Sequence, residues 1–175
     1  NAHVDISFRM GMMWFIFSEI MFFACFFGTL FYVRMFAVPW LGGEGSNAST
    51  NEVLWQGYDA VWPTAGPAEV GGPFGTIPAF GVPFVNTLIL LTSGITVTMA
   101  HHAVKKDDRS GIIWWLIATV ILGFIFVALQ IEEYHVAYTQ LGLTLGSGIY
   151  GSTFFMLTGF HGMHVTLGAI MLTVI

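Results

Sequence analysis

Three ionisable side chains stand inside apolar stretches of this sequence, where titratable groups are rare. Glu19 is surrounded by Phe, Ile and Met, and Ser18 is the polar residue beside it. His161 and His164 are three residues apart, so in a helix they share one face. Acids within membrane segments are candidates for proton handling, although a neutral acid can also simply join two helices by a hydrogen bond. We predict that Glu19 is neutral near pH 7 and is hydrogen-bonded to His161 or His164.

Ligation of haem or a metal is the alternative use of His161 and His164, because histidine is a common axial ligand. Two histidines three residues apart are poorly spaced to bind one metal ion unless other residues supply further ligands. The sequence has no second apolar segment with paired central histidines, as a b-type cytochrome with two haems would need. It also has a single cysteine, Cys25, which excludes a cysteine-based zinc site. We therefore predict no metal site in this chain.

The remaining candidate residues are expected at helix ends. His101 and His102 precede a short basic loop and are interpreted as the inner end of a helix. Glu133, beside Tyr134, is interpreted as the outer end of the next helix, either solvated or in contact with another subunit. Gly94 with Thr98, and Thr158 with Gly162, have the spacing of small residues that lets membrane helices approach closely. No nucleophile stands beside an obvious base, so no catalytic residue is predicted.

The composition shows what environment these residues occupy. The chain has 175 residues, of which 55% are hydrophobic and 9% charged. Ordinary globular domains carry about 25% charged residues. Five basic residues and a net charge of −5 also exclude a nucleic-acid-binding surface. An integral membrane protein is the class that remains.

Residues 1–175 are predicted to form a single membrane domain, an all-α polytopic transmembrane helix bundle. Four stretches have the roughly 20 apolar residues that a spanning helix needs: about 10–33, 84–100, 111–131 and 149–175. An outer loop of about 34–83, rich in Gly, Pro and Trp, joins the first two helices. Arg9 and the basic residues of the 101–110 loop indicate the inner side, whereas the two acidic loops lie outside.

Four blocks of sequence resemble subunit III of the haem–copper cytochrome c oxidases. Phe17-Ser18-Glu19-Ile20-Met21-Phe22-Phe23 is similar to the third helix of that family, and Glu19 matches its buried glutamate. The segment from Asn86 to the Ala100-His101-His102 signature resembles the fourth helix. Glu133-Tyr134 resembles part of the next block, and residues 150–165 resemble the sixth helix closely. Met99 stands where the family usually has Trp, and the outer loop does not match in detail.

The resemblance implies a chain covering helices three to six of a seven-helix subunit. Such a subunit carries no haem or copper, because these cofactors lie in its partners, oxidase subunits I and II. The whole complex oxidises cytochrome c, reduces oxygen to water and pumps protons. Subunit III is then an accessory subunit that stabilises the complex, holds phospholipid and sustains proton uptake.

A proton channel or transporter that uses a buried Glu/His pair is the alternative function. Transporters usually show internal repeats and broken helices, and the sequence shows neither. For the location, the long outer loop favours the bacterial inner membrane over the mitochondrial inner membrane.

Overall fold

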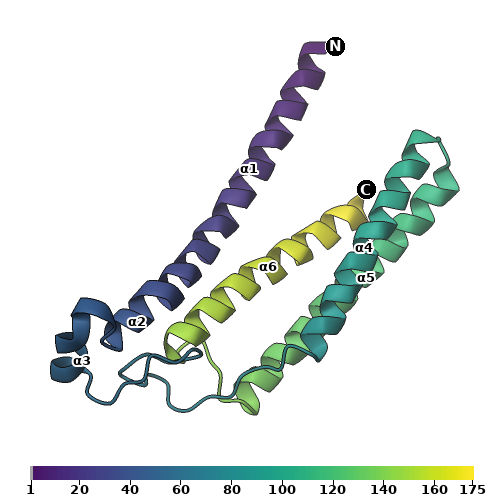
Figure 1. Cartoon of the computed structure of the whole chain (residues 1–175). Helices are drawn as coiled ribbons and strands as arrows, with labels where there is room; N and C mark the ends of the chain where they lie inside the picture. The colour runs from purple at the N-terminus through teal and green to yellow at the C-terminus, as the bar shows by residue number, and fades with distance from the viewer. Residues whose placement is uncertain (1) are drawn as a thin grey trace.

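The computed structural model describes residues 2–175, and their regular secondary structure is helical throughout. Figure 1 shows the long helices arranged with α4 and α5 together, α6 next to them and α1 on the far side of α6. Within residues 2–175, four segments are long and apolar enough to span a membrane. The predicted all-α fold with four membrane helices is therefore confirmed.

The first span is longer than the sequence predicted. Helix α1 covers Ala2–Tyr32, and it continues through a π-helical turn, η1, at Val33–Ala37 and the short α2 at Val38–Leu41. The predicted start near residue 10 excluded the polar N-terminal residues, yet these are helical and include an ion pair between Asp5 and Arg9 at 3.0 Å. An acid and a base four residues apart support each other on one helix face, so polarity there does not end the helix.

The α4–α5 hairpin also extends beyond the apolar runs. Helix α4 covers Val82–Lys105 and α5 covers Arg109–Thr139, against predictions of about 84–100 and 111–131. Asp108 is the N-cap of α5, since its side chain accepts a hydrogen bond of 3.1 Å from the Gly111 N–H. Polar residues near Glu133 mark the edge of the apolar segment rather than the end of the helix.

The last helix, α6, covers Gly148–Val174, close to its predicted range. Its N-terminal end is fixed by the long loop that follows the 3-10 helix η2 at Gly45–Asn47 and α3 at Ala48–Leu54. The ring of Phe74 stacks on Tyr150 with centroids 5.4 Å apart, and Trp62 meets the same tyrosine at 5.6 Å. Gly75 N–H donates to the carbonyl of Leu141 at 2.7 Å. The loop thus packs against one end of the helices.

Small residues join α4 to α5, but not the ones that spacing had suggested. Thr96, Ala100 and Ala103 are buried on α4, and the hydroxyl of Thr96 lies 2.8 Å from that of Thr119 on α5. Gly94 has no side chain or backbone within 4 Å of the position of an added Cβ, and Thr98 is exposed. The Gly94/Thr98 contact is therefore not present among residues 2–175. Two faces of α4 carry small residues, and spacing alone does not choose between them.

Helix α6 meets both of its neighbours through close contacts. The hydroxyl of Thr158 lies 2.6 Å from the phenol oxygen of Tyr134 on α5. A Cβ added to Gly123 of α5 would lie 3.3 Å from the Cβ of Ala169. On the other side, Phe22 and Phe26 of α1 pack against Phe160 with ring centroids 5.2 and 5.3 Å apart. These contacts bring the face of α1 that carries Glu19 against α6.

Candidate functional site

The candidate site lies where α1 and α6 meet near the middle of their lengths. Oε2 of Glu19 lies 2.6 Å from Nε2 of His164. The two side chains retain about a third of their exposure, at 33% for Glu19 and 30% for His164. This approach is the one polar contact of Oε2 within residues 2–175, and it lacks the geometry of a hydrogen bond. The interhelical contact of the acid is therefore made to one imidazole.

The second nitrogen of His164 defines where its proton lies. Nδ1 is 2.6 Å from the carbonyl oxygen of Phe160, one turn earlier on α6. A carbonyl oxygen only accepts hydrogen bonds, so Nδ1 must carry the hydrogen. Nε2 of a neutral His164 is then an acceptor and faces Glu19 with its lone pair. A short contact between Nε2 and Oε2 is then favourable when one of these two atoms carries a proton.

Aromatic rings surround this contact. Phe22 and Phe23 of α1 lie 5.7 and 5.3 Å from the His164 ring, measured between centroids. Phe22 also meets Phe160, the residue whose carbonyl accepts from Nδ1. Phe22 and Phe23 of α1 thus pack beside the imidazole, and Phe22 connects it to Phe160 of α6.

The two histidines of α6 have different surroundings. The His161 ring lies between Phe23 of α1 and Phe126 of α5, at centroid distances of 6.5 and 5.6 Å. It lines a cavity between α4, α5 and α6, and no polar contact between it and Glu19 is present in the described chain. His164 is the histidine that meets the acid, a choice that the sequence had left open.

No metal centre is formed by the side chains that the structure describes. Residues 2–175 contain no group of three or more His, Cys, Asp or Glu side chains that could hold a metal ion. Both histidines lie beside Phe23, and the two nitrogens of His164 contact the Phe160 carbonyl and Glu19.

The other predicted residues lie apart from the Glu19 contact. His101 and His102 are exposed in the last part of α4, with ring centroids 6.4 Å apart. Glu133 differs from its predicted place at an outer helix end: it is 7% exposed, and α5 continues for six residues past it to Thr139. Its side chain points into the bundle because it shares the buried face of α5 with Phe126 and Ala137.

The sequence analysis did not single out two groups that the structure places at the candidate site or in the neighbouring cavity. The Phe160 carbonyl fixes the protonated nitrogen of His164, and backbone partners leave no signal in side-chain spacing. Asn86 is 3% exposed on α4 and lines the same cavity as His161. An amide inside an apolar segment is a detectable signal, so Asn86 could have been singled out as Glu19 was.

Comparison with known proteins decides the family. The family model described as "Cytochrome c oxidase subunit III" matches residues 51–175. This chain belongs to the cytochrome c oxidase subunit III family. Relatives named cytochrome c oxidase subunit 3 from Oncorhynchus mykiss and Pongo abelii are each 39% identical to it, over 171 and 173 residues. The subunit 3 of Struthio camelus is 40% identical over 171 residues.

These matches to subunit 3 cover 98% of this chain and 55% of each relative. The chain therefore spans about half the length of the curated relatives that it matches. A coverage of 98% includes Glu19 and His164 in the comparison with the relatives, whereas the family model covers α6 but not α1.

Proposed function

We propose that this chain acts as the non-redox accessory subunit III of a proton-pumping cytochrome c oxidase. In this role it assembles with subunits I and II, which would hold the haem and copper and carry electrons from cytochrome c to oxygen. Membership of the subunit III family supports the assignment. The absence of a three-residue metal-ligand group within residues 2–175 is compatible with it.

The observation that carries the proposal is the contact of 2.6 Å between Glu19 and His164. We infer that the pair shares one proton, carried either by the acid, with a neutral imidazole, or by Nε2, as an ion pair. Both forms have a net charge of zero because Nδ1 is protonated in each. A proton can therefore move between the two atoms without placing a net charge in the membrane, where a charged side chain costs at least about 2.5–3.5 kcal/mol. We propose that this pair supports proton uptake by the complex.

Co-purification tests the assignment. The full-length subunit is isolated in mild detergent, and the polypeptides, haem and copper that accompany it are identified. We expect redox subunits with haem and copper in the complex, and no stoichiometric Soret band or copper signal in the dissociated chain. A Soret band that stays with the purified polypeptide would contradict the non-redox assignment.

A bound phospholipid belongs to the same proposal. Helix α1 presents exposed apolar side chains such as Trp14, at 66%, and Phe8, at 76% exposure. These side chains would face hydrocarbon in the membrane, and phospholipid is the partner suited to them. Lipid extraction and mass spectrometry of the washed complex test for retained phospholipid, and a complex without retained lipid would contradict this part.

A proton channel or transporter is the second candidate function, because the Glu19–His164 contact crosses between two membrane helices. Liposomes that contain only the full-length subunit distinguish it from an accessory role. Proton flux through these liposomes, abolished by Glu19→Gln, would favour the channel, whereas we expect no flux above that of empty liposomes.

For the location, we propose the bacterial inner membrane rather than the mitochondrial inner membrane. The support is the long loop between α2 and α4, which includes η2 and α3. Cell fractionation followed by immunodetection of the subunit tests this, and recovery in a mitochondrial fraction would contradict it.

A further inference from the structure

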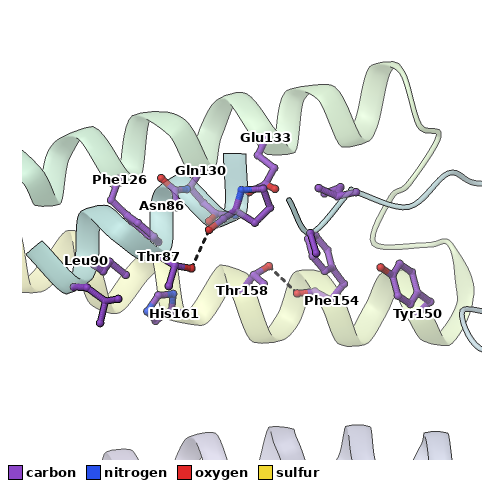
Figure 2. Close-up of a pocket in the computed structure, with 14 residues that line it drawn as sticks. Asn86, Thr87, Leu90, Phe126, Gln130, Glu133, Tyr150, Phe154, Thr158 and His161 are labelled. Atoms are coloured by element: carbon purple, nitrogen blue, oxygen red, sulfur yellow. Dashed lines mark hydrogen bonds between the residues drawn. The ribbon is translucent and has the colours of Figure 1, made fainter. Parts of the chain in front are cut away.

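A second polar site lies away from the Glu19 contact, in a cavity of about 510 Å³ between α4, α5 and α6. Figure 2 shows Asn86, Gln130 and Glu133 entering the space between these helices, with His161 and Thr158 across from them. Ile77 of the long loop and Pro83 at the start of α4 also line it. Most of the wall is apolar, so the polar groups are concentrated at a few points.

Two of these side chains are deeply buried and unpartnered. Asn86 is 3% exposed and Glu133 is 7% exposed. Both Nδ2 and Oδ1 of Asn86, and Oε1 of Glu133, have no hydrogen-bond partner among residues 2–175. They come from different helices, and neither side chain uses the other.

Unpaired buried polar atoms carry the full penalty of desolvation, so proteins rarely leave them without a partner. The other polar side chains that line the cavity do not supply one: Gln130 and His161 make no hydrogen bond to these atoms. Thr87 donates to the Pro83 carbonyl at 2.9 Å, and Thr158 donates to the Phe154 carbonyl at 2.7 Å while also meeting Tyr134. The missing partner must therefore enter the cavity, and it must both donate and accept hydrogen bonds, since the amide presents a donor and an acceptor.

We propose that this cavity is a water-binding site, in which an ordered cluster of water molecules bridges Asn86 of α4 to Glu133 of α5. Water donates and accepts at the same time, as the amide and the carboxyl group together require. Buried water typically makes two to four hydrogen bonds, and a molecule occupies about 30 Å³ in the liquid, so the cavity has room for several. The bridge would complete the α4–α5 interface at the level of the loop, where no direct side-chain bond joins Asn86 to Glu133.

A structure of the intact oxidase at a resolution that shows water tests the proposal. We expect ordered density within hydrogen-bond distance of both the Asn86 amide and the Glu133 carboxyl. An acyl chain, or a protein side chain that bonds these atoms directly, would overturn it. This map decides the question even if no variant assembles.

Substitution of Asn86 by leucine gives an independent test. The dissociation temperature of the complex should change in opposite directions for a cavity that holds water and for a dry one. If water binds there, Asn86→Leu removes its partner, so the complex should lose the density and dissociate at a lower temperature. If the cavity is dry, the same change removes unsatisfied groups and should raise the dissociation temperature, which would overturn the proposal. Thr98→Val is the control, because this exposed residue of α4 bonds only to the carbonyl of Gly94 in the described chain. It should leave the dissociation temperature and the density unchanged.

Discussion

At the scale of single residues, one hydrogen bond donated to a backbone carbonyl decides the chemistry of the candidate site. The Phe160 carbonyl accepts from Nδ1 of His164, which leaves Nε2 for Glu19. The proton between Nε2 and Oε2 can then belong to either atom. Experiments on this pair must therefore observe the proton as well as the side chains.

Infrared spectroscopy can locate that proton. With neutral His164 as the acceptor, Glu19 is a carboxylic acid, and we expect a C=O stretch that shifts in D₂O. Glu19→Gln should remove this band. The difference spectrum of wild type against Glu19→Gln in the intact complex checks the prediction. A spectrum with only carboxylate bands would show that the pair is ionic.

Removal of the imidazole should destabilise the contact between α1 and α6. His164→Leu leaves Oε2 of Glu19 without its partner, and an unpaired buried oxygen costs about 1–3 kcal/mol. Denaturant titration of the full-length subunit in detergent measures this loss. Met163→Leu is the control, because Met163 is 47% exposed on the same helix. Equal stabilities of the two variants would show that the contact contributes nothing.

At the scale of helices, close approach depends on which glycine faces a neighbour. A Cβ on Gly123 of α5 would lie 3.3 Å from Ala169, whereas one on Gly94 of α4 meets nothing within 4 Å. Both glycines lie within membrane helices and look alike in the sequence.

Leucine substitutions should separate these two glycines. Gly123→Leu forces α5 and α6 apart, and overpacking of this kind costs about 1–3 kcal/mol. Gly94→Leu should cost nothing, since its side chain enters open space beside α4. The stability of the two variants in a denaturant titration checks the prediction. A larger loss for Gly94→Leu would mean that another segment covers that face of α4.

The hydroxyl pair between α4 and α5 should give a modest interaction energy. Thr96 and Thr119 lie 2.8 Å apart, and each also bonds to a carbonyl of its own helix. Hydrogen bonds between membrane helices average about 0.6 kcal/mol in double-mutant cycles. A cycle with Thr96→Val, Thr119→Val and the double variant should give a coupling of that size. A coupling of zero would show that the two hydroxyls are independent.

At the scale of the whole molecule, the two ends of the bundle differ. The start of α1 and the α4–α5 turn lie at one end, while α3, the long loop and the α5–α6 connection lie at the other (Figure 1). The basic residues Lys105, Lys106 and Arg109 stand at the first end. The bias of basic residues toward the cytoplasmic side therefore predicts that this end is inside.

Cysteine labelling tests the orientation. In a Cys25→Ala background, we expect Asp59→Cys in the long loop to react with an impermeant maleimide from outside intact cells. Lys106→Cys in the α4–α5 turn should react only after the membrane is opened. Both replaced side chains are exposed, so a lack of access would not explain a negative result. The reverse pattern would invert the topology.

The sequence by itself determined the membrane class, the four spans and the shared depth of Glu19, His161 and His164, because hydropathy and helical spacing are local properties. The sequence also contains the motifs by which it resembles the subunit III family. Helix lengths were less predictable, since α1 and α5 continue past the apolar segments. Hydropathy marks the membrane, whereas backbone hydrogen bonds and caps such as Asp108 define the helix.

The tertiary structure alone decided which of several equivalent residues makes each contact. His164 rather than His161 meets Glu19, Thr96 rather than Gly94 joins α4 to α5, and Glu133 turns inward. Each choice depends on how one helix is rotated against another. Helical spacing fixes which residues share a face, but the direction of that face is set by packing between segments far apart in the chain.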